Sequence, residues 1–172
     1  NSGTESTMYA VRVARSATGK MGLLKVEGGY HGSYDPFVVS SKPSLDVIGD
    51  PENPTPAIDS NLVPGDIYVV PFNNLNALER MFETNSSKIA CFIVEPVLEN
   101  LAIVLPDAGY LEGVRALCDK YDVVLIFDEV KTGLTAGAHG ASARLGVQPD
   151  LITLAKSIGG GLPLAAFGGK KK

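Results

Sequence analysis

The strongest constraint on the fold comes from continuous apolar runs that each end in a carboxylate. Residues 89–94 read Ile-Ala-Cys-Phe-Ile-Val and lead into Glu95, and residues 123–127 read Val-Val-Leu-Ile-Phe and lead into Asp128. Between them, residues 107–121 carry apolar side chains at helical spacing. Strands that are apolar on both faces belong in a parallel sheet covered by helices on both sides. The pattern therefore predicts an α/β fold with three layers, α/β/α, around a mostly parallel sheet.

The rest of the chain continues this alternation of helices and strands. Gly19 is a stop signal for a first helix, and Asp107 is expected to be the N-cap of the helix over 107–121. Five prolines between residues 43 and 64 predict an irregular surface excursion, because proline removes backbone donors. Expected helices cover residues 4–16, 74–83 and 107–121, expected strands cover 23–27, 67–70, 89–95, 123–127, 151–154 and 164–167, and a glycine-rich loop covers 28–35.

Charge and composition argue against several classes of protein. The net charge is −4 and no basic stripe is visible, so nucleic acid is not an expected partner. No apolar run reaches the length needed to cross a bilayer, and the N-terminus lacks the pattern of a signal peptide. Cys91 and Cys118 lie in apolar patterns, which predicts buried thiols in a reducing compartment, the cytoplasm. Without a CxxC motif or a Cys/His cluster, no metal site is expected.

Two charged residues follow predicted strands at the edge where such sheets bind ligands. An ionised Asp128 there needs a cationic partner or strong hydrogen bonds, and a protonated pyridine nitrogen would serve. The alternatives are a carboxylate that caps the next turn, or a metal ligand. Lys156 follows the apolar residues 151–154 and precedes three glycines. A partly buried lysine becomes nucleophilic, as Schiff-base chemistry requires, whereas the alternative is a surface lysine beside a flexible loop.

Two glycine-containing segments add further candidates. Ser2, Gly3 and Thr4 open the first helix, where hydroxyls, backbone N–H groups and the positive helix end can bind an anion. An ordinary N-cap is the alternative for these residues. Tyr30 has glycines on both sides, so its ring could stack on a planar heterocycle. A packed tyrosine in a glycine-rich turn is the alternative for that residue.

Taken together, these segments resemble the class III aminotransferases, enzymes that use pyridoxal 5'-phosphate. The resemblance covers essentially all 172 residues, and within that group the chain is most similar to glutamate-1-semialdehyde 2,1-aminomutase and its relatives. It implies the large domain of the fold-type I pyridoxal-phosphate transferases. The motifs that carry it are Asn1-Ser2-Gly3-Thr4-Glu5, Tyr30-His31-Gly32, Phe127-Asp128-Glu129-Val130, and Lys156 followed by Gly159-Gly160-Gly161-Leu162-Pro163.

The resemblance implies a role for most of these residues. Lys156 would form the Schiff base with pyridoxal phosphate and shuttle the proton at the substrate α-carbon, and Asp128 would keep the pyridine nitrogen protonated. The other implied contacts are Tyr30 and Val130 on the two ring faces, Ser2, Gly3 and Thr4 at the phosphate, and Glu95 and Asn100 near the ring edge. His31 follows Tyr30 as in the family, and its role is left open.

The resemblance also implies what this stretch lacks. Residues 1–172 correspond to a single cofactor-binding core, truncated relative to a family member that has an N-terminal segment before it and a C-terminal small domain after it. An Arg that often follows the family's Thr-Gly-Phe is replaced by Thr135. The implied activity is amino-group transfer on a small amino acid or an amine/keto substrate, in a homodimer or larger self-association.

An alternative is a truncated homologue without transaminase activity, which would act as a binding protein or have recruited hydrolase activity of the esterase kind. The chain has no GxSxG motif, so hydrolysis has little support from the sequence. The substrate itself, and whether transfer, intramolecular transfer, racemisation or decarboxylation follows, cannot be read from these residues.

Overall fold

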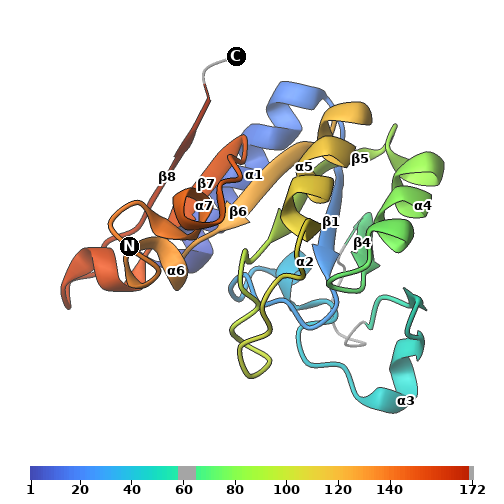
Figure 1. Ribbon diagram of the computed structural model, residues 1–172, viewed down its shortest axis with the longest axis horizontal. Coiled ribbons are helices and arrows are strands. Elements are labelled where there is room, and N and C mark those ends of the chain that lie inside the picture. Colours follow the sequence, from blue (N-terminus) through green and yellow to red (C-terminus); the bar gives the residue numbers. More distant parts are fainter. Residues whose placement is uncertain (58–64, 171–172) are drawn as a thin grey trace.

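The computed structural model describes residues 1–57 and 65–170 and contains a six-stranded sheet in the order β4-β1-β5-β6-β7-β8 (Figure 1). Neighbouring strands are parallel except for the last pair, in which β8 runs antiparallel to β7. The mostly parallel α/β arrangement is therefore as predicted. The strands are β1 Gly22–Val26, β4 Ile67–Val70, β5 Ile89–Val94, β6 Val124–Asp128, β7 Leu151–Leu154 and β8 Ala166–Gly169.

Helices cover both faces of the sheet and complete the three predicted layers (Figure 1). One face packs against α1 (Gly3–Thr18), whose Ala10, Val11 and Ala14 are fully buried with the side chains of one sheet face. The opposite face packs against α4 (Leu75–Asn85) and α5 (Tyr110–Lys120) through a second apolar cluster. Every residue of β5 and β6 is buried as a result. Short helices complete the described part: α2 Asp35–Val38, α3 Leu45–Ile48, α6 Thr132–Thr135, α7 Gly140–Leu145 and the 3-10 turn η1 Lys156–Gly159.

The direction in which strands are added to the sheet reverses at β1, which we call the switch point. β1 pairs with β4 on one side and with β5 on the other, so the chain leaves β1 and β5 in different directions. In open parallel sheets the crevice outside the carboxyl ends of such strands is where ligands bind. The segments that follow β1, β5, β6 and β7 all meet at this edge.

Two expectations for element boundaries need correction. The helix α5 begins at Tyr110 and not at Asp107, because Asp107 lies in a turn in which its carbonyl accepts from the Tyr110 N–H at 3.0 Å and Gly109 is the N-cap (φ 82°). The last strand covers Ala166–Gly169, two residues later than expected.

The proline-rich excursion is partly ordered into small elements. Residues 43–57 contain α3 and a two-stranded ribbon of Gly49–Asp50 and Asn53–Pro54. The remainder of the predicted excursion, residues 58–64 with Pro64, lies outside the described residues. Both cysteines are free and buried, as expected, and burial raises the pKa of the Cys91 thiol to about 12. Within the described ranges, no helix has the length and apolarity that a membrane crossing requires.

Asp150 ties three elements together at the start of β7. Its carboxylate accepts from the Leu125 N–H of β6 at 2.8 Å and from the Arg115 guanidinium of α5 at 2.8 Å. Burial by itself raises the pKa of Asp150, but the Leu125 N–H and Arg115 lower it more, so the pKa lies below its usual value of 3.8. A carboxyl group with a depressed folded-state pKa stabilises the fold at neutral pH and loses this contribution in acid.

We expect Asp150→Asn to lower the free energy of unfolding by about 1–3 kcal/mol at neutral pH, because two charge-assisted hydrogen bonds are weakened. The difference from the wild type should shrink as the pH falls below about 4, because the Asp150 carboxyl of the unfolded chain then takes up a proton, and it should vanish once the pH is below the lower native pKa. Urea unfolding at neutral and acidic pH measures both effects. Asp119→Asn is the matched control, because Asp119 pairs with the same Arg115 but its side chain is 67% exposed. A control effect as large as that of Asp150→Asn at neutral pH would contradict this account.

Candidate functional site

A cavity of about 170 Å³ lies at the carboxyl edge of the sheet, where the loops after β1, β5, β6 and β7 meet the N-terminus of α1. Eight of the ten residues predicted for the site line it, whereas Ser2 and Asn100 do not. Two further residues, Gly32 and Lys131, also contribute to its wall. The eight predicted residues that line it are Gly3, Thr4, Tyr30, His31, Glu95, Asp128, Val130 and Lys156.

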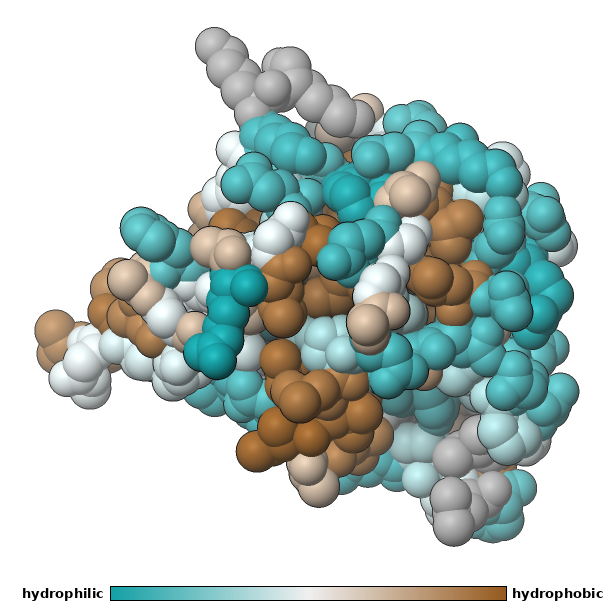
Figure 2. Space-filling view, in the orientation of Figure 1, coloured by the Kyte–Doolittle hydropathy of each residue, from teal (hydrophilic) through white to brown (hydrophobic). Residues whose placement is uncertain are grey.

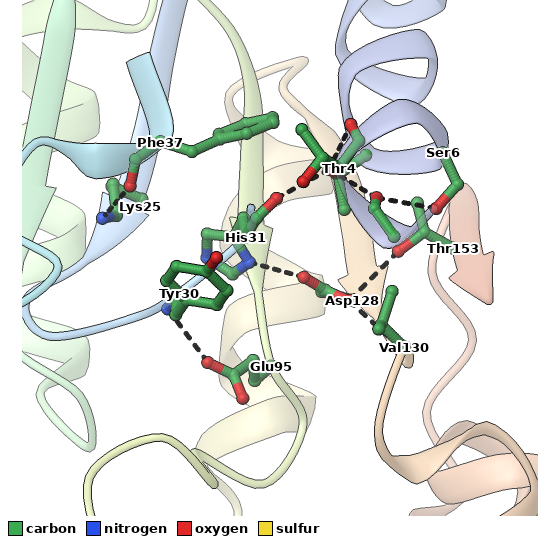
Figure 3. Close-up of polar contacts among 12 residues, drawn as sticks. Thr4, Ser6, Lys25, Tyr30, His31, Phe37, Glu95, Asp128, Val130 and Thr153 are labelled. Carbon is green, nitrogen blue, oxygen red and sulfur yellow. Dashed lines mark hydrogen bonds and ion pairs between the residues drawn. The ribbon is translucent and has the colours of Figure 1, made fainter. Parts of the chain in front are cut away.

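Asp128 is the most highly coordinated of these residues (Figure 3). It is 5% exposed at the end of β6. One carboxylate oxygen, Oδ1, accepts from the Val130 N–H at 3.0 Å and from the Thr153 hydroxyl at 3.2 Å. The other, Oδ2, lies 2.7 Å from His31 Nδ1. Because an ionised carboxylate can only accept, His31 Nδ1 carries the proton in this contact. Three donors therefore hold a charged carboxylate at the cavity wall.

His31 is fixed from several sides. Its side chain is fully buried, and its backbone carbonyl accepts from the Thr7 hydroxyl of α1 at 2.7 Å. The ring packs edge-on against Phe37, with 6.0 Å between ring centroids. Among the described residues its second nitrogen, Nε2, has no hydrogen-bond partner. These contacts orient the imidazole so that Nδ1 faces Asp128. The sequence left the role of His31 open, and the structure places it as a hydrogen-bond partner of that carboxylate.

Tyr30 and Glu95 form the neighbouring wall of the cavity (Figure 3). The Glu95 carboxylate follows β5 and accepts from the Tyr30 N–H at 3.1 Å, which joins the two loops that diverge at the switch point. Burial raises the pKa of Glu95, and the charge of His31 and the Tyr30 N–H oppose that rise. The Tyr30 side chain is 41% exposed, so one face of its ring is open for a ligand.

The N-terminus of α1 forms another part of the wall. Ser2 is the N-cap, and its hydroxyl accepts from the Glu5 N–H at 3.3 Å and donates to the Glu5 carboxylate at 3.0 Å. The amides of Gly3 and Thr4 stand in the first helical turn, so no carbonyl of the same helix precedes them as a partner. Gly32 (φ 109°) passes so close to Thr4 that a Cβ there would collide with it. The ordinary N-cap thus accounts for Ser2, while Gly3 and Thr4 line the cavity.

Lys156 lies in the turn η1 after β7 and lines the cavity. It is exposed, in contrast to the partly buried lysine expected from the sequence, and its backbone has a left-handed conformation (φ 50°). The strand β7 and Ala155 are packed, but no described residue covers Lys156 itself. Asn100 is displaced from the cavity because the chain turns away after Glu95, and its amide Nδ2 is buried without a partner among the described residues.

Several supporting residues were not singled out from the sequence. Thr153 and Thr7 are buried hydroxyls that reach Asp128 and His31 from neighbouring elements, and nothing in their local sequence distinguishes them. Glu129 is fully buried and accepts from the Thr132 hydroxyl at 3.1 Å and from the Ser142 N–H at 2.9 Å. It thereby fixes α6 and α7 behind Asp128. Its place directly after Asp128 was the available signal, because a second buried carboxylate also needs donors.

The cavity thus combines a buried carboxylate, an amine, an open aromatic face and the first turn of a sixteen-residue helix. This set suits a planar heterocycle with a protonated ring nitrogen, an aldehyde and a phosphate. The first-turn amides suit the phosphate, and Asp128 Oδ2, which has a single partner among the described residues, retains a free lone pair. Within residues 1–57 and 65–170, no group of three or more His, Cys, Asp or Glu side chains could hold a metal ion.

The sequence is similar to that of a known protein family over its whole length. The family model for class III aminotransferases matches residues 1–172. A glutamate-1-semialdehyde 2,1-aminomutase of Desulfovibrio desulfuricans is 48% identical over 100% of this chain and 40% of its own length. The chain therefore spans about two fifths of that relative.

Solved structures give the same result. An omega-transaminase from Sphaerobacter thermophilus superposes with a TM-score of 0.92 and 35% identity over 99% of this chain and 39% of its own. A glutamate-1-semialdehyde-aminomutase from Pseudomonas aeruginosa PAO1, solved in complex with PMP, gives a TM-score of 0.84 and 27% identity over 98% of this chain and 36% of its own. With a family model that matches its whole length, this chain belongs to the class III aminotransferase family.

Proposed function

We propose that this chain forms the pyridoxal-phosphate site of an enzyme that transfers amino groups, either an aminotransferase or a protein like glutamate-1-semialdehyde aminomutase. The observation that carries the proposal is the buried Asp128 carboxylate, held by three donors beside a cavity that Lys156 and the first turn of α1 also line. The substrate is a small amino acid or an amine/keto compound, and the compartment is the cytoplasm. Residues 1–172 are the cofactor-binding core of the large domain.

Each part of the cavity has a complementary part of the cofactor. Asp128 would bind the pyridine nitrogen, Tyr30 and Val130 would contact the two ring faces, and Gly3 and Thr4 would donate to the phosphate. When bound, pyridoxal phosphate supplies an electron sink for the bonds at the substrate α-carbon.

The chain's own residues handle the protons. His31 donates from Nδ1 to Asp128, and an acceptor-only carboxylate at this position would favour a protonated ring nitrogen over a neutral one. Lys156 Nζ would hold the aldehyde end of the cofactor and would be the base that moves the proton at the substrate α-carbon. Glu95 keeps Tyr30 in place through its backbone N–H.

After unbound pyridoxal phosphate has been removed, the wild type is expected to keep a visible absorbance band that Lys156→Ala lacks, because Lys156 Nζ is the amine assigned to the cofactor's aldehyde. Lys88→Ala is the matched control, since Lys88 is an exposed lysine that precedes β5 at the opposite edge of the sheet. Absorbance spectroscopy on the three purified proteins gives the answer. A wild type without the band would refute the proposal and favour the alternative of a binding protein or a recruited hydrolase, which assays with simple esters would then examine.

Asp128→Asn should raise the dissociation constant of pyridoxal phosphate about 10- to 100-fold, because one charge-assisted hydrogen bond to a buried group contributes about 1.5–3 kcal/mol. Titration of the visible band measures this constant. Asp122→Asn removes the same charge at a surface position 85% exposed and should leave the constant unchanged. Equal constants for Asp128→Asn and the wild type would exclude the assigned role of Asp128.

We further infer that a second copy of this chain covers an apolar surface after β5. Leu101, Ile103, Val104 and Leu105 are between 40% and 66% exposed. They lie in the loop over residues 98–105 that projects below α5 in Figure 1 and coincides with the apolar cluster in Figure 2. The exposed aliphatic side chains of such a cluster favour association with another protein surface.

Ile103→Glu is expected to shift the protein from dimer to monomer, because a carboxylate would be buried in the contact. Size-exclusion chromatography with light scattering, over a range of protein concentrations, reports the mass. Met21→Glu places the same charge on another exposed apolar residue, before β1, and should leave the mass unchanged. A wild type that is monomeric at every concentration would contradict the dimer.

A further inference from the structure

Lys25 is the most unusual buried residue of the sheet. It is the penultimate residue of β1, between Val69 of β4 and Ile93 of β5, and its exposed fraction is zero. Lysines are almost never fully buried unless their charge is compensated. It does not line the cavity that holds Asp128 and Lys156. The buried ammonium group therefore needs specific hydrogen-bond partners, and its role is not direct contact with a ligand.

The partners lie in the segment where α2 ends. Lys25 Nζ donates to the Phe37 carbonyl at 2.9 Å, to the Val39 carbonyl and to the Ser41 hydroxyl at 3.4 Å. These three contacts match the three donors of an ammonium group. The Ser41 hydroxyl also donates to the Phe37 carbonyl at 2.6 Å. The hydrogen bonds of this one amine thus hold residues 37–41 together next to β1.

Electrostatics keep this group charged. Burial lowers the pKa of Lys25 to about 8, while the carboxylates of Glu27 and Glu95 oppose that shift. At neutral pH the side chain is therefore mostly an ammonium ion and can make all three contacts at once.

Residues 37–41 contact His31 and the loop that carries Tyr30, the two cavity residues on this side (Figure 3). The Phe37 ring packs against His31, which binds Asp128. The carbonyl of Ser40, a fully buried residue in a left-handed conformation (φ 51°), accepts from the Gly28 N–H at 2.7 Å. Gly28 opens the loop that carries Tyr30. The segment therefore fixes both the ring of His31 and the start of the loop that carries Tyr30.

We propose that Lys25 is a positioning residue of the cofactor site, which holds residues 37–41 so that His31 stays on Asp128 and Tyr30 stays at the cavity wall. The proposal rests on the proposed function only for its consequence on cofactor binding. The effect on the contact between His31 and Asp128 exists without any cofactor.

The test uses Lys25→Met, which keeps the length of the side chain and removes its donors, with Lys88→Met as the matched control at an exposed lysine. Proton and nitrogen NMR of the histidine rings in the protein without cofactor reads the contact directly. The chain has two histidines, and only buried His31 is expected to show a protected Nδ1 proton, since His139 is exposed.

We expect this signal to shift or disappear in Lys25→Met and to persist in Lys88→Met. The dissociation constant of pyridoxal phosphate should rise about 10- to 100-fold in Lys25→Met alone, as displaced site residues typically cost that much. An unchanged His31 signal in a folded Lys25→Met would overturn the proposal.

A purely structural lysine would lower the unfolding midpoint without moving the His31 signal in the protein that remains folded, and circular dichroism measures that midpoint. If Lys25→Met does not fold, Ser41→Ala replaces it, because this change removes one of the three acceptors of Lys25 and the bond from Ser41 to Phe37. A shift of the His31 signal in Ser41→Ala supports the proposal, and an unchanged His31 signal overturns it. Failure of the wild type to bind pyridoxal phosphate would instead refute the proposed function, because the NMR readout needs no cofactor.

Discussion

A charged carboxylate placed at the end of a fully buried strand has to be supplied with donors, and much of the arrangement at the sheet edge follows from this need. Asp128 receives one donor from its own turn, one from β7 and one from the loop after β1. Each donor comes from a different segment, so the three hydrogen bonds of Asp128 join β6 and β7 to the loop after β1. Without these donors the burial of the charge would cost several kcal/mol.

Around this centre, further buried polar groups fix the segments that approach it. Glu129 accepts from the first turn of α7 and from α6, which holds the chain after β6. Glu95 joins the loop after β5 to Tyr30. Lys25 gathers the segment after α2. All three charges lie away from bulk water and are compensated by backbone groups, an arrangement that favours one conformation of the loops over many.

The cavity side chains differ in how tightly the described residues hold them. Asp128 and His31 are buried and bound, whereas Tyr30 and Lys156 are substantially exposed. The rigid half can fix a heterocycle by its ring nitrogen. The open half leaves Tyr30 and Lys156 accessible, and the exposed apolar segment proposed to contact a second copy begins a few residues after Glu95.

The sequence by itself determined the three layers, the strands that end in Asp128 and Glu95, and the candidates Gly3, Thr4, Tyr30 and Lys156, because apolar runs, helical spacing and glycines are local patterns. Only the tertiary structure decided how these residues support one another. The bonds of Thr153, Thr7 and Lys25 join separate elements that are 12 or more residues apart, so no local pattern reveals them. The same reason explains two errors. Asp107 lies in a turn, where its N–H donates to Asn73 Oδ1, and α5 begins only at Tyr110. The path of the chain after Glu95 leaves Asn100 outside the cavity.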